Sequence, residues 1–414
     1  MRLMLFHQYF LGKDDPGGSR WNQFVKYFSS ENEKMFIDIM AGNIHYATGK
    51  QVGESAWYNK EMVSQGVIVH RTWTYSGYNT NFIGRLIGYF SYMFSSFLRS
   101  LFLAKPDMII VSSPSLFVGI SALMLSKLKR IPFIFEVRDL WPESAISTGV
   151  LSNTILIKVL YMLEGLLYRH AVKIIVLTPA FEKNISERFP ECSHKISIIT
   201  NGADFDIALD LSSREKIRKE YGWEGKKVFA YFGAHGVAND LDQMVNIARV
   251  YCNNDKIVFA LIGDGMQKKS LQRRADEYQL NNIQFIDSVP KSLVYDYMNA
   301  SDICMAILKK TDTFKTVYPN KVFDYMRCKK PIIITIDGIT RELVLEAKCG
   351  LYSPPEDQDA LEKSINDFMH KSNLELEQMG EYGFTYVSKH FDRKRIASKY
   401  LTIVTKEINA ARTV

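Results

Sequence analysis

Cysteine is scarce in this sequence, and none of the usual cysteine patterns occurs. The 414 residues include five cysteines, without a Cys-x-x-Cys pair, at Cys192, Cys252, Cys304, Cys328 and Cys349. Disulfide-rich secreted domains and zinc-binding domains depend on paired or closely spaced cysteines. The pattern therefore argues against both classes and fits a protein of the reducing cytosol.

The sequence also lacks a secretory leader and an uninterrupted membrane span. Met1-Arg2 runs directly into an apolar stretch that reads as a strand rather than a signal. Two uncharged stretches stand out, but 86–98 is too short to span a bilayer and 108–126 is broken by Ser112-Ser113-Pro114-Ser115. We therefore expect a cytoplasmic protein.

The first uncharged stretch belongs to a helix predicted from Asn81 to Ala104, which is rich in Phe and Tyr and contains Arg85 and Arg99. Aromatic residues at helical spacing are most often core residues. An aromatic helix with flanking cations also suits a membrane interface. The sequence leaves both interpretations open.

The overall composition is that of a normally folded protein, with 47% hydrophobic and 23% charged residues. The net charge is +7. The excess lies in the first half, with 21 Lys and Arg against 16 Asp and Glu over residues 1–205, and 31 against 29 over the remainder. Such a balance favours phosphates, nucleic acid or an acidic membrane as partners, unless it is simply a solvated basic face.

Short apolar strand patterns alternate with helical patterns along the chain, in one series over 2–199 and a second over 227–336. This alternation predicts α/β architecture with parallel sheets and helices on both faces, and two series predict two doubly wound, Rossmann-like domains. We expect an N-terminal domain over 1–204 and a second domain over 205–384. The remaining segment, 385–414, is expected to be a C-terminal helix that packs back on the first domain.

Ligands of open parallel sheets bind at the carboxyl ends of the strands, so the loops there are the candidate sites. Paired glycines, Gly17-Gly18, follow the first strand, and the charged run 136–143 follows the fifth. In the second series, strands lead into Gly233-Ala234-His235-Gly236 and Gly263-Asp264-Gly265. Both loops lack the third glycine of a dinucleotide fingerprint and no P-loop lysine motif occurs, so an NAD site is not expected.

Three acidic triplets could be read as metal-binding motifs: Asp204-Phe205-Asp206, Asp240-Leu241-Asp242 and Asp357-Gln358-Asp359. A hard cation needs several converging oxygen ligands, and none of these triplets clearly leaves a strand. We expect no bound metal.

The most informative stretch is Tyr318-Pro319-Asn320-Lys321-Val322-Phe323-Asp324-Tyr325-Met326. Its predicted helix begins at the proline and carries Lys321 and Asp324 on one face of the first turn. The lysine could meet phosphate oxygens beside the free amides of the helix N-terminus, and the carboxylate could accept from sugar hydroxyls, which suits a phosphorylated ribose. An ordinary i,i+3 surface pair is the alternative.

These motifs follow one another in a defined order: Gly17-Gly18, Asp139-Leu140-Trp141-Pro142-Glu143-Ser144, Leu177-Thr178-Pro179-Ala180-Phe181, Ile199-Thr200-Asn201-Gly202-Ala203-Asp204, Tyr231-Phe232-Gly233, Gly263-Asp264-Gly265 and Pro319 to Met326. In this order they resemble glycosyltransferase family 4, whose members are retaining, two-domain GT-B enzymes. The likeness is greatest to the bacterial O-antigen and capsule branch that includes N-acetyl-L-fucosamine transferases. It spans nearly the whole chain.

The resemblance implies a GT-B fold with two domains facing a cleft, a nucleotide-sugar donor on the second domain and an acceptor on the first. We expect the donor to be UDP-linked and no cofactor or metal to be required. The donor-binding candidates are Gly17, Gly18, Gly233, His235, Gly236, Gly263, Asp264, Gly265, Ser288, Val289, Lys315, Pro319, Asn320, Lys321 and Asp324. The acceptor-binding candidates are Arg138, Trp141 and Glu143, and the catalytic candidates are Asp139, Lys321 and Asp324.

The candidates differ in role. Lys321 would stabilise the leaving diphosphate. Asp139 would orient the acceptor hydroxyl or take its proton, unless it forms a salt bridge with a neighbouring arginine. His235 is either a ligand-binding residue or a core or capping residue.

The sequence departs from the family pattern in the donor loops. The family has an arginine and a lysine after the first strand of the second domain, but Gly233 to Asp242 holds no basic residue except His235. The family's two acidic residues would align with Thr316 and Asp324, so one acid is missing and the other is an aspartate. More of the diphosphate charge would then fall on Lys321, together with Lys315.

The expected function is transfer of a sugar from a nucleotide sugar to a lipid-diphosphate-linked or other glycan acceptor in bacterial surface polysaccharide synthesis. The first domain would contact the cytoplasmic face of the plasma membrane peripherally, and nucleic acid is not an expected partner. Two alternatives stay open. One is a nucleotide-sugar epimerase of the same architecture, and the other is a non-catalytic nucleotide- or lipid-binding partner of a polysaccharide assembly.

Overall fold

The computed structural model describes residues 1–12, 20–31, 34–45, 51–54, 57–79, 82–113, 115–147, 149, 151–207, 210 and 212–413. The described residues divide into two compact units. The first unit holds those up to Thr200 together with 394–413, and the second holds those of 201–393. No helix in these ranges has the length and hydropathy that a bilayer span requires.

The first unit is built on an eight-stranded sheet with the strand order β3-β4-β2-β1-β5-β6-β7-β8. Its strands are β1 (Arg2–Phe6), β2 (Phe36–Gly42), β3 (Tyr58–Ser64), β4 (Val67–Thr72), β5 (Met108–Ser112), β6 (Phe133–Val137), β7 (Lys173–Val176) and β8 (Ile196–Ile198). Its longer helices are α1 (Arg20–Glu31), α2 (Phe82–Leu101), α3 (Leu116–Lys129), α5 (Thr154–His170), α6 (Pro179–Arg188) and α15 (Arg393–Arg412), with the short α4 (Glu143–Ser147) between β6 and α5.

The second unit is built on a six-stranded parallel sheet with the order β11-β10-β9-β12-β13-β14. Its strands are β9 (Lys227–Phe232), β10 (Ile257–Ile262), β11 (Ile283–Ile286), β12 (Ile303–Ile307), β13 (Ile332–Thr335) and β14 (Gly350–Tyr352). Its helices are α7 (Ser213–Glu220), α8 (Asp242–Val250), α9 (Lys268–Glu277), α10 (Lys291–Ala300), α11 (Asn320–Arg327), α12 (Ile339–Glu346), α13 (Gln358–His370) and α14 (Asn373–His390).

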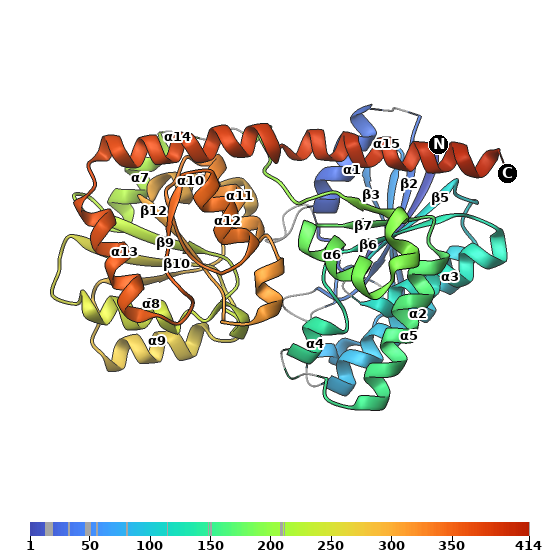
Figure 1. The fold of residues 1–414 in the computed structure, drawn as a ribbon, viewed down its shortest axis with the longest axis horizontal. Helices are drawn as coiled ribbons and strands as arrows, with labels where there is room; N and C mark the ends of the chain where they lie inside the picture. The colour runs from blue at the N-terminus through green and yellow to red at the C-terminus, as the bar shows by residue number, and fades with distance from the viewer. Residues whose placement is uncertain are drawn as a thin grey trace. The chain divides into compact units, whose positions relative to one another are not determined.

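Helices cover both faces of the second sheet, as strands that are apolar along their whole length require. Along β9, Val228 and Ala230 point into one core cluster and Phe229 and Tyr231 into another. The first cluster packs under α10, α11 and α12, and the second under α8, α9 and α13 (Figure 1). The prediction of a two-domain α/β fold with doubly wound sheets is confirmed.

The prediction of purely parallel sheets misses one strand. β3 pairs antiparallel with β4 at the edge of the first sheet. Most residues of β3 are exposed or half-buried, including Lys60 and Glu61. An edge strand with so little buried surface carries no continuous apolar run, which is the signal that identifies the buried strands.

The C-terminal segment contains the end of one helix and a second helix, rather than the single C-terminal helix predicted over 385–414. Helix α14 ends at His390 and α15 begins at Arg393. Between them the backbone pairs with Ala203, which donates to the Phe391 carbonyl at 2.9 Å and accepts from the Arg393 amide at 3.0 Å. These strand-like hydrogen bonds use groups that a continuous helix would need.

Helix α15 contributes to the core of the first unit. Tyr400 is fully buried, and its ring centroid lies 5.4 Å from that of Trp21 and 5.7 Å from that of Phe24. Ala397 and Val404 join the same apolar cluster, which also holds Leu3 and Leu5 of β1. The first unit is therefore completed by the last helix of the chain.

Candidate functional site

Two glycine loops and the start of α11 meet at the carboxyl ends of β9 and β10. Gly233 has a φ of +137°, and a Cβ there would come within 3.1 Å of Lys321 Nζ. A Cβ on Gly263, whose φ is +149°, would lie 1.9 Å from the Gly233 carbonyl oxygen. Only glycine allows this approach and this backbone conformation. The sequence therefore brings the two loops into direct contact beside a lysine.

His235 lies between the same loops. Its backbone amide donates to the Asp264 carbonyl at 2.8 Å, and its own carbonyl accepts from Gln267 at 2.9 Å. A Cβ on Gly265 would clash with the His235 backbone at 2.6 Å. These contacts fix the histidine on the loop that follows β10.

The imidazole of His235 is fully buried, and within the described part of the chain neither ring nitrogen has a hydrogen-bond partner. Burial, followed by the nearby charge of Lys268, lowers the pKa of His235 to about 4. The ring is therefore neutral at physiological pH, with a donor and an acceptor that are both free for a ligand.

Lys321 lies on the first turn of α11, above the ring of Tyr231. Its Nζ is 3.8 Å from the Tyr231 ring centroid, is buried, and has no hydrogen-bond partner among the described residues. Burial lowers the pKa of Lys321 to about 7. A buried ammonium without a counter-ion is costly, so this position is prepared for an anion.

Asp324 lies one turn further along α11. Its Oδ1 accepts a hydrogen bond from the Tyr295 hydroxyl at 3.0 Å. Because Lys321 Nζ has no partner in the described structure, Lys321 and Asp324 do not form the ordinary surface pair that the sequence allowed.

The other donor-binding candidates differ in their hydrogen-bond partners and in their exposure to solvent. Lys315 pairs with Asp312 at 2.7 Å, and the Thr316 hydroxyl donates to the Thr313 carbonyl at 2.7 Å, both within a 3-10 turn. Asn320, which follows Pro319 at the start of α11, has a buried Oδ1 without a partner in the described structure. The remaining candidates are accessible to different degrees: Ser288 and Asp264 are exposed, while Gly236 and Val289 are half-buried. Gly17 and Gly18 lie outside the described residues.

Sequence reasoning missed a second cation beside these loops. Lys268, at the start of α9, is buried, and its Nζ donates to the Gly263 carbonyl at 3.0 Å and pairs with Asp287 at 2.5 Å. The family pattern predicts basic residues only after β9. The signal for Lys268 is its position shortly after Gly263-Asp264-Gly265, where the next helix begins.

In the first unit, Arg138 and Asp139 follow β6. The Arg138 amide donates to Ser113 Oγ at 2.9 Å, and its guanidinium lies 3.4 Å from His7 Nε2. Asp139 is half-buried, and the nearby charge of Arg138 favours its ionised form. Burial raises its pKa to about 6, against the opposing effect of a hydrogen bond from Ser144. Asp139 is therefore mostly ionised at pH 7 and close to the point where it takes up a proton.

Trp141 and Glu143 are held in structural contacts. The Trp141 ring packs edge-on against Phe117, with centroids 6.5 Å apart. Glu143 pairs with Arg188 at 2.9 Å, and Arg188 also binds the fully buried Glu164 at 2.6 Å. Both candidates therefore shape the loop, whatever else they contact.

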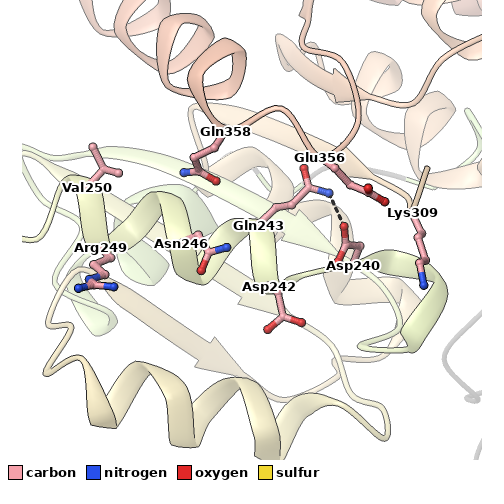
Figure 2. Close-up of a pocket in the computed structure, with 9 residues that line it drawn as sticks. All are labelled: Asp240, Asp242, Gln243, Asn246, Arg249, Val250, Lys309, Glu356 and Gln358. Carbon is pink, nitrogen blue, oxygen red and sulfur yellow. Dashed lines mark hydrogen bonds between the residues drawn. The ribbon is translucent and has the colours of Figure 1, made fainter.

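A polar groove of about 800 Å³ also lies in the second unit (Figure 2). It is lined by Asp240, Asp242, Gln243, Asn246, Arg249, Val250, Lys309, Glu356 and Gln358. The Gln243 side chain donates to Asp240 at 2.7 Å, and charges of both signs face the groove. None of the predicted site residues lines it.

Comparison with known proteins matches each unit to a family model. Residues 213–385 match the model "Glycosyl transferases group 1", and residues 47–202 match "Glycosyl transferase 4-like domain". The two matched segments lie one in each unit, and the chain has the two-domain GT-B fold. The paired loops with Lys321 lie in the group 1 domain, and the Arg138–Glu143 loop lies in the 4-like domain.

Curated relatives are distant. The chain is 24% identical to the probable glycosyltransferase WbjE of Pseudomonas aeruginosa, over 60% of this chain and 62% of WbjE. It is 24% identical to WcaI of Escherichia coli, a putative colanic acid biosynthesis glycosyl transferase, over 70% of this chain and 73% of WcaI. The match to WbjE therefore spans less than two thirds of that protein's length.

Solved structures share the fold over almost the whole chain. A sucrose-phosphate synthase from Thermosynechococcus elongatus superposes with a TM-score of 0.75 at 14% identity, covering 99% of each chain. HepE of Anabaena, in complex with UDP-glucose, gives a TM-score of 0.71 at 16% identity, covering 98% of this chain and 100% of HepE. WaaG, a glycosyltransferase involved in lipopolysaccharide biosynthesis, gives 0.67 at 13% identity, covering 98% of this chain and 100% of WaaG.

Proposed function

We propose that this protein transfers a sugar from a UDP-sugar to a lipid-diphosphate-linked acceptor during synthesis of a bacterial surface polysaccharide. The observation that carries the proposal is the buried Lys321 ammonium, which has no counter-ion in the described structure and adjoins Gly233 and His235. A diphosphate is the ligand whose charge such a site lacks.

The relatives support the choice of substrates. HepE was solved with UDP-glucose, and a trehalose-6-phosphate enzyme of Escherichia coli was solved with UDP-2-fluoroglucose. WcaI is described by its role in colanic acid biosynthesis and WaaG by its role in lipopolysaccharide biosynthesis. A UDP-sugar donor and a glycan acceptor of the cell surface therefore suit this chain.

In the proposed reaction the bond between the sugar C1 and the β-phosphate oxygen breaks, and a bond from C1 to the acceptor hydroxyl oxygen forms. The bonding electrons leave with the diphosphate, where Lys321 stabilises the negative charge that develops. Asp139 takes the acceptor proton or orients the hydroxyl. Asp324 holds ribose hydroxyls through its carboxylate. We propose that the configuration at C1 is retained and that no metal takes part.

A panel of nucleotide sugars, scored by release of free nucleotide with bacterial membranes as acceptor, tests this function. Lys321→Ala should lose at least about 100-fold in turnover, as removal of one stabilising donor does. Lys329→Ala is the matched control, since Lys329 follows the same helix and pairs with Glu381 on the surface. Turnover with EDTA present should equal turnover without it.

Calorimetric titration with UDP and GDP separates the enzyme from a non-catalytic partner. Binding of UDP with no turnover of any UDP-sugar would favour the non-catalytic partner. If neither nucleotide binds, the donor site itself is wrongly assigned.

A further inference from the structure

Three helices of the first unit expose stripes of large apolar side chains. The stripe on α2 continues into Phe102, and comprises Ile87, Phe90, Phe94, Leu98 and Phe102. The stripe on α3 comprises Met124 and Leu128, and that on α5 comprises Ile155, Val159, Met162 and Leu166. Exposure ranges from 40% at Leu98 to 80% at Phe102. Spacings of three and four residues place each stripe on one face of its helix.

The three stripes belong to one surface because the helices are packed side by side. Helix α3 contacts both α2 and α5, and the three lie together in Figure 1. Their inward faces share a small apolar cluster that includes Tyr89, Phe117 and Leu160. Trp141, from the proposed acceptor loop, packs against this cluster. We call the outward stripes together the α2–α3–α5 face.

The exposed charged residues of these three helices are of one sign. The three helices contain a single acidic residue, Glu164, which is fully buried and bound to Arg188. Four cations on or next to the helices are exposed and form no ion pair with any described residue: Lys105, Lys127, Arg130 and Lys158. A face of exposed apolar side chains whose helices carry only cations at their exposed charged positions is unusual for a surface that meets only water.

We propose that the α2–α3–α5 face lies on the surface of an anionic lipid bilayer. Apolar side chains would enter the boundary between headgroups and acyl chains, and the four cations would meet anionic headgroups. A second copy of this chain fits less well, because pairing the face with itself would bring like charges together. The proposal rests on the proposed function in one respect, since it gives a lipid-linked acceptor a route to the Trp141 loop.

Sedimentation of the full chain with vesicles tests the proposal. We expect binding to vesicles of phosphatidylethanolamine and phosphatidylglycerol, much weaker binding to phosphatidylcholine alone, and loss of binding at high salt. The double variant Phe94→Ser/Met162→Ser should bind at least about tenfold more weakly, because two of the most exposed apolar anchors are removed. Lys127→Gln and Lys158→Gln should each weaken binding by roughly fivefold.

Matched controls come from exposed residues outside the face. Met62 and Leu374 are 77% and 74% exposed, so Met62→Ser and Leu374→Ser remove comparable apolar side chains. Lys60→Gln removes an exposed lysine on β3. All three should bind vesicles like the unmodified chain, and melting curves should show every variant folded.

Three results would overturn the proposal. The first is an unmodified chain that does not bind the anionic vesicles, and the second is face variants that bind as well as the controls. The third is a concentration-dependent dimer in light scattering that the face variants abolish, which would assign the face to self-association. UDP titration keeps the two proposals apart: Lys321→Ala should still bind vesicles, and the face variants should still bind UDP.

Discussion

The loops of the two units hold their polar groups in opposite states. In the second unit, Lys321 and His235 are buried beside glycine backbone with no hydrogen-bond partner among the described residues. In the first unit, Arg138 and Glu143 are bound to neighbouring protein groups. Lys321 and His235 thus lack the partners that Arg138 and Glu143 have, although the second carboxylate oxygen of Glu143, Oε2, is itself buried without a hydrogen-bond partner in the described structure.

This difference predicts where a ligand should bind most tightly and where a substitution should lower the stability of the fold most. Unsatisfied buried polar groups lower stability, and a ligand that satisfies them recovers the loss as binding energy. Satisfied ion pairs contribute to the fold but have little left to offer a ligand. We therefore expect substitutions in the second unit to act on donor binding, and those around Arg188 to act on folding.

The largest effect should come from Lys321→Met, which replaces the unpaired ammonium by an apolar side chain. Turnover should fall by at least about 100-fold while the free energy of unfolding rises by about 1–2 kcal/mol, since a site strained for function is relieved. Thermal melting and nucleotide-release assays on the same preparation measure both. If the variant is inactive and also less stable, the unpaired charge of Lys321 does not lower the stability of the fold.

Arg188→Met should have the next largest effect, and on stability alone. It leaves the buried Glu164 without its cationic partner and with the Tyr168 hydroxyl alone, which should cost about 3–5 kcal/mol in urea unfolding. Arg169→Met is the control, because its pair with Glu191 is exposed and should matter by less than about 1 kcal/mol. UDP affinity should be unchanged in both variants as long as they are folded.

Asp139→Asn tests whether Asp139 takes part in the reaction, unlike Arg138 and Glu143, which bind neighbouring protein groups. Because the pKa of Asp139 is raised to about 6, kcat/KM should rise with pH through that value as the carboxylate forms. The variant should lose this acid limb and about 10- to 100-fold in kcat/KM at pH 7. An unchanged pH profile would show that Asp139 only shapes the loop.

The smallest effect should be on the pH dependence of UDP binding. A bound diphosphate raises the pKa of Lys321 from about 7, so binding takes up a proton above that pH. Affinity should therefore fall by up to about tenfold from pH 7 to pH 8. Lys321→Arg should flatten this slope, because arginine stays charged. Titrations in buffers of different ionisation enthalpy count the proton directly.

Much of the fold could be predicted from the sequence because its strands are buried on both faces. Such strands are short apolar runs, as in 227–232 and 257–262, and periodicity identifies them. β3 and the break before Arg393 depend on partners far away in the chain, namely β4 and Ala203. Local patterns carry no information about such partners.

The candidate site divides in the same way. Glycine loops and a helix start could be predicted as a ligand region because each is a local motif. That Lys321 has no counter-ion, that its ammonium lies on the Tyr231 ring, and that Lys268 joins the loops from α9 are facts of packing. They depend on which side chains the fold brings together, and one chain's sequence does not list those neighbours.

The placement of Tyr400 in the first unit has a consequence for how the protein is made. Trp21 and Phe24 leave the ribosome early, but Tyr400, which packs against them, is synthesised only after the whole second unit. The part of the protein that is translated first is thus the part that finishes folding last. A premature stop that removes only α15 would spare every residue of the donor loops and still leave the first unit without its closing layer.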